Sequence, residues 1–338
     1  MLLVADDPRF SDHDPGPGHP ERPARSAAVR RGLDTAGFAD AYVPLEPREA
    51  TIDELARVHR EELLETLTSL DGRGGGRIDA DTRAGPGSFG IARRAAGAGL
   101  AAIDALDAGR ADAAFLAVRP PGHHATAGRS MGFCLVNNVA VAAAALADRG
   151  ERVAIVDVDA HHGNGTQDIF WNDPRVAYVS FHEWPLYPGT GRIDERGGPD
   201  APDGVCNLPL PSGATGDVYL EGLDRVVAPF LDAFAPGWML LSLGFDAHRD
   251  DPLTGLALSA GDYGVLVQRL AALAPRPGRT VAFLEGGYDL DALTHSTAAT
   301  VPGLLGIAAG REPVEPTTGG GPGSAVVSEA VRRRAGRA

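Results

Sequence analysis

Short apolar runs alternate along most of the chain with longer stretches that are rich in alanine and leucine. Runs of about four to eight apolar residues without polar alternation predict strands that are buried on both faces. The expected strands cover residues 2–6, 41–45, 113–118, 153–158, 176–181, 238–243 and 280–284. The expected helices cover about 19–36, 51–70, 88–109, 132–149, 216–235, 260–274 and 289–309. This alternation predicts an α/β fold, a three-layer α/β/α sandwich around a central, mostly parallel sheet.

Local signals set the element boundaries and the extent of the domain. Thr51 and Glu54 resemble a capping box at a helix start. Residues 71–87, rich in Gly, Asp and Arg, predict an exposed loop. Because we find no internal repeat and no central linker, we expect residues 1–310 to form one domain. Residues 311–338 are expected to be a Gly/Pro-rich, disordered linker (311–323) followed by a short basic tail helix.

Composition excludes several classes of protein. The formal net charge of −14 argues against direct nucleic-acid binding and is compatible with cationic substrates. No apolar run reaches the roughly 18 residues of a membrane span, and the first ten residues do not resemble a secretory signal, so we expect a cytoplasmic protein. Two cysteines are too few for a disulfide framework. The chain contains no lysine, which excludes Schiff-base catalysis and a Walker A lysine.

Metal-capable and proton-handling side chains follow several of the expected strands. The stretch RVAIVDVDAHHGNGTQ (152–167) starts as a strand and ends in acids, histidines and glycines. Its Asp-x-Asp-x-His order would direct Asp157, Asp159 and His161 to one face of an extended backbone. Further strand ends carry a pair of histidines at 123–124, an aspartate at 246 and a tyrosine at 288. Each alone has a simpler explanation, such as a helix cap, but together they predict an active site at the carboxyl edge of the sheet.

A series of motifs resembles the zinc-dependent histone deacetylase family, which includes bacterial deacetylase-like amidohydrolases and acetylpolyamine amidohydrolases. The motifs are RPPGHHA (119–125), GFCLVNN (132–138), DVDAHHGNGTQ (157–167), SFHEWPLYPGTG (180–191), GFDAHRDDPLTG (244–255) and EGGYDL (285–290). They follow the family order, and HPERP at residue 19 fits the family's amino-terminal loop. The resemblance implies an arginase/deacetylase-like fold and makes residues 1–310 a deacetylase-like catalytic domain.

The resemblance implies a role for each polar residue of these motifs. Asp159, His161 and Asp246 would bind Zn²⁺, leaving a position open for water and a substrate carbonyl. His124 would be the general base toward water and then the acid toward the leaving amine. His123 would act mainly electrostatically, its ring held by Asp157. The Tyr288 hydroxyl would stabilise the tetrahedral oxyanion.

One position assigns the chain to a branch of that family. Asn164 stands where class I enzymes have an aspartate paired with the second histidine, so the signature resembles class II. A neutral partner stabilises protonated His124 less than a carboxylate would. The adjacent His162 is expected to be structural.

The resemblance also implies a substrate tunnel and a second cation. Phe133 and Tyr187 would form aromatic walls, Gly132 would supply a backbone acceptor, and Leu253 would be a gatekeeper position. Leucine there weakens a polyamine reading, because an acidic gatekeeper favours acetylated polyamines in one branch. A structural monovalent cation such as K⁺ would bind Asp157, the Ser180 hydroxyl and the backbone carbonyls of Asp159, His161 and Phe181.

These observations predict a zinc-dependent amidohydrolase that removes acetyl or other short acyl groups from acyl-lysine or small acylated amines such as acetylpolyamines. One alternative is an arginase-like dimanganese hydrolase, although Asn164 lies near where another carboxylate would be needed. Another is a non-catalytic acyl-lysine binding module, against which the retained histidines and tyrosine argue. The expected partner is an acylated amine rather than nucleic acid or membrane, and the sequence leaves the oligomeric state open.

Overall fold

The structure is a computed structural model that describes residues 1–307 and 315–335. Eight strands form one sheet in the order β2-β1-β5-β10-β9-β6-β7-β8, and every neighbouring pair is parallel. The strands are β1 (Leu2–Ala5), β2 (Tyr42–Pro44), β5 (Ala113–Leu116), β6 (Val153–Asp157), β7 (Val176–Glu183), β8 (Val205–Leu210), β9 (Trp238–Leu243) and β10 (Thr280–Leu284). The predicted parallel α/β sheet is therefore confirmed.

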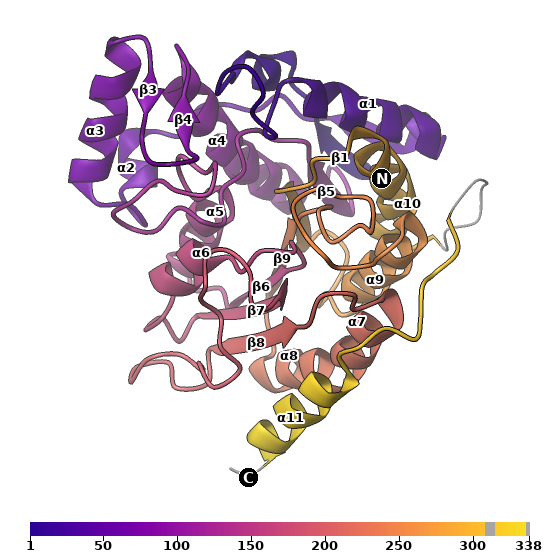
Figure 1. Ribbon diagram of the computed structural model, residues 1–338. Helices are drawn as coiled ribbons and strands as arrows, with labels where there is room; N and C mark the ends of the chain where they lie inside the picture. Colours follow the sequence, from indigo (N-terminus) through magenta and orange to yellow (C-terminus); the bar gives the residue numbers. More distant parts are fainter. Residues whose placement is uncertain (308–314, 336–338) are drawn as a thin grey trace.

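Helices cover both faces of the sheet, which is why its central strands are apolar throughout (Figure 1). One face is covered mainly by α4 (Ser88–Asp107) and α5 (Asn138–Ala147), with α2 (Ile52–Leu55), α3 (Glu61–Gly72) and α6 (Asn164–Ile169) nearby. The other is covered by α1 (Ala24–Ala36), α7 (Gly216–Gly222), the π-helical turn η3 (Leu223–Val227), α8 (Ala228–Phe234), α9 (Ala260–Ala272) and α10 (Leu290–Leu304). Two separate clusters of buried apolar side chains, one on each face, complete the three-layer sandwich.

The sheet brings the functional loops together. Strands β5, β10, β9 and β6 are consecutive neighbours in the middle of the sheet, and all run the same way. The loops that follow them therefore leave from one edge, where ligands bind in open α/β sheets. Those loops carry the four groups of polar residues that the sequence placed at strand ends.

Several boundaries differ from the sequence expectations. Strand β8 was not predicted, because it contains Pro209, which is tolerated there since β8 lies at the sheet edge. The helix expected from residue 132 begins only at Asn138, with the Asn137 side chain as its N-cap. Residues 71–87 include the end of α3 and a short antiparallel hairpin of β3 (Gly76–Arg77) and β4 (Arg83–Ala84) in place of a simple loop. The capping box of Thr51 and Glu54 is confirmed at α2.

The remaining short elements are single turns of 3-10 helix, η1 (Pro8–Asp12) and η2 (Ala39–Ala41), on either side of α1. Within the described residues, no helix is both long and apolar enough to cross a membrane.

The C-terminal strap, residues 315–323, is bound to the rest of the chain. Thr318 donates from its backbone N–H and its hydroxyl to Asp262 over 3.0 and 2.7 Å. The backbone N–H of Gly320 donates to Asp217 over 2.9 Å, and the Glu315 carboxylate lies 3.0 Å from Nε2 of His248. These contacts differ from the expectation of a disordered linker; residues 311–314 lie outside the described part.

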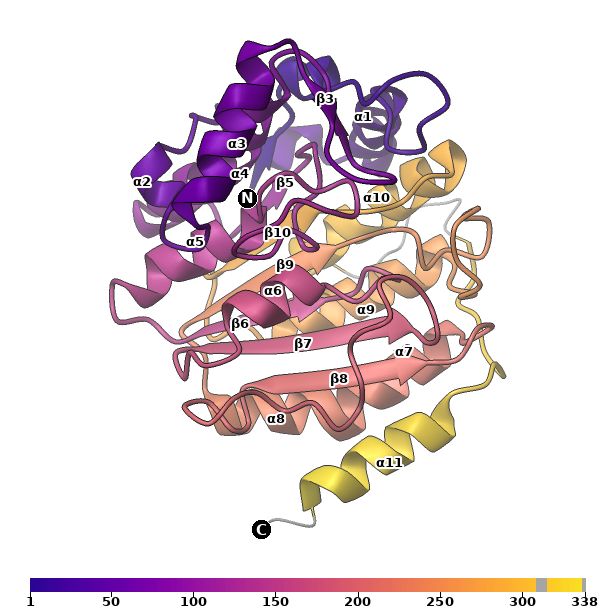
Figure 2. The same ribbon diagram turned by 60° about the vertical axis from the view of Figure 1, so that its left-hand side comes forward.

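After the strap, α11 (Ser324–Ala335) packs against α7, η3 and β8 and buries Val327 and Ala330 (Figure 2). The expected basic tail helix is thus present over these residues, whereas 336–338 are outside the described part. A short apolar stripe on an otherwise charged helix is enough to dock it on the sheet edge.

Candidate active site

Three buried side chains form a metal-capable cluster at the carboxyl edge of the sheet. Asp159 and His161 follow β6, and Asp246 follows the neighbouring β9; one donor atom of each lies within 4.8 Å of the others. Nδ1 of His161 is 3.2 Å from Asp159 Oδ1 and 3.0 Å from Asp246 Oδ2. Backbone N–H groups hold the two carboxylates: Gly286 donates to Asp159 and Ala160 donates to Asp246, each over 2.8 Å.

The electrostatics of this cluster fit a bound cation. Burial and the neighbouring Asp159 carboxylate raise the pKa of Asp246 to about 7. Two carboxylates that repel each other in a buried site are stabilised when a positive ion binds between them. Two carboxylates with one imidazole form a three-residue donor set suited to a divalent ion such as zinc, with room for a further ligand. The three residues named from sequence are therefore together and chemically suited to a metal.

His124 is placed as a neutral base. Its Nδ1 lies 2.8 Å from Oδ1 of Asn164, the first residue of α6. Burial, followed by the nearby His123 and His161, keeps the pKa of His124 well below its usual value. An amide oxygen only accepts hydrogen bonds, so Nδ1 carries the proton and Nε2 keeps its lone pair. The His124 and His161 ring centres are 6.0 Å apart, which puts this base beside the metal-capable cluster.

His123 has the opposite electrostatic character. Its Nδ1 is 3.0 Å from Oδ2 of Asp157, and its Nε2 is 3.8 Å from Oδ1 of Asp159. Burial alone would lower the pKa of His123, but these two carboxylates outweigh burial and raise it to about 10. The Tyr178 hydroxyl also donates to Asp157 Oδ2, over 3.0 Å. Asp157 therefore faces the histidine that the sequence assigned to it.

Two glycines allow these rings to approach the backbone. A Cβ atom on Gly163 would lie 2.3 Å from Asp157 Oδ2 and 2.4 Å from the Tyr178 hydroxyl. A Cβ on Gly132, whose φ is +56°, would lie 2.4 Å from the His124 ring. A side chain at either position would displace the histidine pair. Gly132 thus has a packing role beside His124 in addition to the substrate contact expected of it.

Tyr288 lies at the end of β10 as a protonated hydroxyl. Burial raises the pKa of Tyr288 well above its usual value, so the side chain can donate a hydrogen bond. Its backbone N–H donates to Asp251 over 2.7 Å, and the guanidinium carbon of Arg25 lies 5.1 Å from its ring centre. Arg25 also donates to the carbonyls of Gly287 and Glu285 over 2.7 and 2.6 Å. The loop that carries Tyr288 is therefore held from both sides.

Aromatic side chains surround the candidate site. Phe133 makes edge contacts with His19 and Tyr288, at ring-centre distances of 4.6 and 5.7 Å. Tyr187 makes an edge contact with His124 at 5.2 Å and remains 38% exposed. Phe133 and Tyr187 thus lie against different parts of the site.

Leu253 is also 37% exposed and follows Asp251, which accepts a hydrogen bond from its backbone N–H. A cavity of about 470 Å³ opens beside Tyr288 and is lined by Pro252 and by residues 16–20. This places the Gly16–Gly18 loop at the rim of that cavity.

Comparison with known proteins identifies the family. The model for the histone deacetylase domain matches residues 19–304. The chain belongs to the histone deacetylase family.

A probable deacetylase from Archaeoglobus fulgidus is 40% identical over 312 residues, which cover 90% of this chain and 87% of that protein. A histone deacetylase-like amidohydrolase from Pseudomonas aeruginosa is 37% identical over 303 residues, covering 88% and 80%. The crystal structure of the HDA15 HD domain matches with a TM-score of 0.91 and 35% identity, covering 100% of this chain and 95% of that one. The predicted family and its deacetylase-like fold are confirmed.

The expected monovalent-cation residues of this histone deacetylase family member lie beside the metal-capable cluster. Ser180 pairs in register with Asp157 on the adjacent strand. The Ser180 hydroxyl lies 2.9 Å from Nδ1 of His182, whose Nε2 lies 2.9 Å from the carbonyl of Gly191. Since Nε2 must donate to that carbonyl, the hydroxyl donates to Nδ1 and its oxygen keeps lone pairs for a cation. The Phe181 side chain is buried against Tyr219, so only its backbone could contribute.

Sequence reasoning gave no role to three residues that organise this histone deacetylase site. Glu285 accepts from the backbone N–H groups of Gly122 and His123 over 2.6 and 3.2 Å, and so holds the histidine loop. Tyr178 donates a hydrogen bond to Asp157, and Asp251 accepts one from the backbone N–H of Tyr288, so both also hold parts of the site in place. Glu285 lies three positions before Tyr288 in the EGGYDL motif, and this was the one feature of the sequence that could have indicated its role. His162, expected to be structural, contacts Thr190 and Gln167 over 2.8 and 3.0 Å.

Proposed function

We propose that this chain is a zinc-dependent amidohydrolase that removes acetyl or other short acyl groups from acylated primary amines. The observation that carries the proposal is a neutral His124, with a free Nε2, beside the cluster of Asp159, His161 and Asp246. Base, metal-capable donors and the Tyr288 hydroxyl come from four neighbouring strand ends, as hydrolysis of an unactivated amide requires.

Asp159, His161 and Asp246 would hold the zinc ion, because their donor atoms converge and their mutual repulsion favours a cation. When bound, zinc would supply Lewis-acid activation of the reacting oxygens. The same three residues would hold the ion beside the histidine pair, within the buried site.

The chain's own residues supply the proton transfers. Nε2 of His124 takes a proton from water as the water oxygen bonds to the acyl carbon. The Tyr288 hydroxyl donates a hydrogen bond to the carbonyl oxygen, which becomes negatively charged in the transition state. His124 then gives its proton to the leaving nitrogen as the C–N bond breaks, which yields a primary amine and a carboxylate. His123, kept positive by Asp159 and Asp157, stabilises the negative charge that develops nearby.

The substrate class follows from the charge of the rim. Asp79 and Asp81 lie in the β3–β4 hairpin, and Thr82 of that hairpin accepts from the backbone N–H of Phe133 over 3.1 Å. Burial, and to a smaller extent the Asp81 and Asp79 carboxylates, raise the pKa of Tyr187 above its usual value. Carboxylates at the entrance attract substrates that carry positive charge. Both acyl-lysine in a basic peptide and monoacetylated polyamines have this property.

A structural monovalent cation such as K⁺ forms part of the proposal. The free lone pairs of the Ser180 hydroxyl and the adjacent Asp157 carboxylate support it, and Asp159, His161 and Phe181 would add backbone carbonyls. By fixing Asp157 the ion would keep the His123 ring in place.

The arginase-like alternative needs carboxylates for a second metal. Among the described residues, the acids around the three-donor cluster are already bound: Asp157 to His123 and Tyr178, and Glu285 to two backbone N–H groups. Two manganese ions per chain together with arginine hydrolysis would favour that alternative. A zinc-loaded protein that bound acyl-lysine but hydrolysed no acylated amine would instead favour a binding module.

The experiment is a hydrolysis panel with metal analysis of the same preparation. Acetyl-lysine peptides, longer acyl-lysine peptides, acetylputrescine and acetylspermidine would be compared for kcat/KM. One zinc ion per chain and release of acetate or a longer carboxylate would support the proposal. Failure on every acylated amine by zinc-loaded protein would overturn it.

A further inference from the structure

A cavity of about 560 Å³ lies at the end of the sheet opposite the candidate active site. Residues that precede β6, β7 and β8 line it, including Arg152, Pro174 and Gly204, together with parts of η3, α8 and α11. Because the strands are parallel, their amino ends lie far from the loops that carry the metal-capable cluster. Helix α8 lies near this end of the molecule, and the C-terminal end of α11 is directed toward it (Figure 2).

Two arginines of this cavity have no carboxylate partner among the described residues. Nε of Arg152 donates to the carbonyl of Phe234 over 2.9 Å, and its guanidinium carbon lies 4.1 Å from the centre of that ring. Nη2 of Arg334 donates to the carbonyl of Val205 over 2.8 Å, and its guanidinium carbon lies 4.4 Å from the Phe230 ring centre. A guanidinium has several N–H groups, so each retains donors for an anion.

The other charged residues of the cavity are largely neutralised. Arg196 is paired with Asp203, and Arg225 with Glu221. Asp200 is an exposed carboxylate of the lining and offsets part of the positive charge. The excess positive charge thus comes from Arg152 and Arg334, in a protein whose formal net charge is −14.

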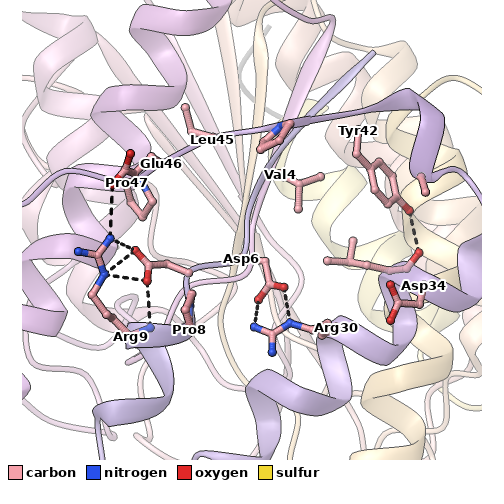
Figure 3. A pocket seen from close by; sticks show the side chains of 14 residues that line it. Val4, Asp6, Pro8, Arg9, Arg30, Asp34, Tyr42, Leu45, Glu46 and Pro47 are labelled. Carbon is pink, nitrogen blue, oxygen red and sulfur yellow. Dashed lines mark hydrogen bonds and ion pairs between the residues drawn. The ribbon is translucent and has the colours of Figure 1, made fainter.

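A second cavity, of about 740 Å³, shows what a neutralised arginine pair looks like (Figure 3). It is lined by parts of β1, β2 and α1 and by the segments that follow the two strands, and its two arginines are each held by an aspartate of the same cavity. Arg30 donates to Asp6 over 2.6 and 2.9 Å, and Arg9 donates to Asp7 over 2.9 and 2.6 Å. The two aspartates neutralise Arg30 and Arg9, whereas Arg152 and Arg334 have no such carboxylate partner among the described residues.

The floor of the 560 Å³ cavity is apolar. The rings of Phe230 and Phe234 lie under the two guanidinium groups, and Pro229, Ala233 and Val331 also contribute. A concave site of a few hundred Å³ with an apolar floor and a few polar groups is typical of small-molecule sites. Here the polar groups are guanidiniums, which bind planar or tetrahedral oxyanions.

We propose that this cavity binds a small anionic amphiphile. Its carboxylate or phosphate head would lie between Arg152 and Arg334, and its alkyl or aromatic body would cover Phe230 and Phe234. Such a ligand would connect the residue before β6 with α11, and so would hold the C-terminal helix against the sheet.

The probes are octanoate, octyl phosphate and uncharged octanol, titrated calorimetrically below their aggregation concentrations. We expect saturable binding of one or both anions and none of octanol. Arg152→Gln and Arg334→Gln should each weaken binding by about tenfold or more, the usual loss for a charged hydrogen bond. Arg30→Gln, which changes a paired arginine in the 740 Å³ cavity, should leave the affinity for the anions unchanged.

Two further variants remove the remaining ambiguities. The anionic probes could also bind at the metal-capable cluster of the candidate active site. Asp246→Ala, which changes that cluster, should therefore bind the anions as tightly as the parent does. Asp200→Asn should bind them more tightly, because it removes a repelling charge. Equal binding of octanol, no saturable binding of either anion, or full retention in both Arg152→Gln and Arg334→Gln would overturn the proposal.

Discussion

Nδ1 of His124 donates a hydrogen bond to the amide oxygen of Asn164 across 2.8 Å. The neighbouring His123 faces a carboxylate, Asp157, at 3.0 Å. Burial and the nearby His123 and His161 lower the pKa of His124, whereas the carboxylates of Asp159 and Asp157 raise that of His123 despite its burial. The neutral ring can act as a base while the other stays positive.

Replacing Asn164 with aspartate should shift the pH dependence of catalysis. A carboxylate stabilises protonated His124 and so raises its pKa. Since the base must be neutral, the acidic limb of kcat/KM should move to higher pH, and activity below that limb should fall. The measurement is a pH profile of kcat/KM. Asn172→Asp adds the same charge at an exposed position and should leave the profile unchanged. An unmoved limb in Asn164→Asp would show that His124 is not the titrating base.

Replacing Tyr288 with phenylalanine should lower kcat with little change in metal content. Removing one hydrogen-bond donor to an oxyanion typically costs about 3 kcal/mol, or roughly 100- to 1,000-fold in rate. Steady-state kinetics with zinc measured on the same sample test this. Turnover equal to that of the parent would exclude the oxyanion role.

Replacing Asp246 with alanine should reduce zinc bound per chain, because it removes one of three donor residues. Metal analysis after dialysis gives a readout independent of activity. Asp232→Ala is the matched control, since Asp232 is an exposed aspartate of α8 outside the metal-capable residues and its loss should leave the ion bound. Full occupancy in Asp246→Ala would mean that the ligand set is wrong.

His59 should make the fold sensitive to acid. It accepts a hydrogen bond from the backbone N–H of Asn137 over 2.9 Å at Nε2 and donates from Nδ1 to the carbonyl of Thr126, so the neutral ring fits its site. Burial lowers the pKa of His59 from 6.5 to about 4. Below pH 6.5 the unfolded chain takes up a proton that the folded chain excludes, so stability falls as pH drops from about 6.5 to 4.

The expected loss from this one group is at most about 3 kcal/mol. The free energy of unfolding, measured with denaturant across that pH range, should depend less on pH in His59→Gln than in the parent. His295→Gln, at an exposed histidine, should keep the parent's dependence. The same slope in His59→Gln as in the parent would contradict this assignment.

The sequence predicted the parts of the molecule that depend on local pattern. Apolar runs located the central strands, and the residues just after them were correctly expected at one edge of the sheet. Strand β8 was not predicted because Asn207 and Pro209 interrupt its apolar run. A strand can contain these residues here because β8 lies at the edge of the sheet. The start of α5 was misplaced because Phe133 adopts a φ of +69°, which no local propensity indicated.

The contacts that hold the reactive groups in place were harder to predict from the sequence than the reactive groups themselves. Glu285 binds backbone N–H groups more than 160 positions earlier in the chain, at Gly122 and His123. Asp251 similarly binds the backbone N–H of Tyr288. Any residue can offer a backbone N–H, so such pairs leave no compositional signal, and only the folded arrangement identifies them.

The C-terminal strap has a consequence for the order in which the molecule is made. Glu315 binds His248, in the loop that carries Asp246, and Thr318 binds Asp262 at the start of α9. Both strap residues are translated after every strand and after all three metal-capable residues. A nascent chain can therefore contain the whole candidate active site before this loop gains its final support. Partial translation products are expected to be looser around Asp246 until residue 315 has left the ribosome.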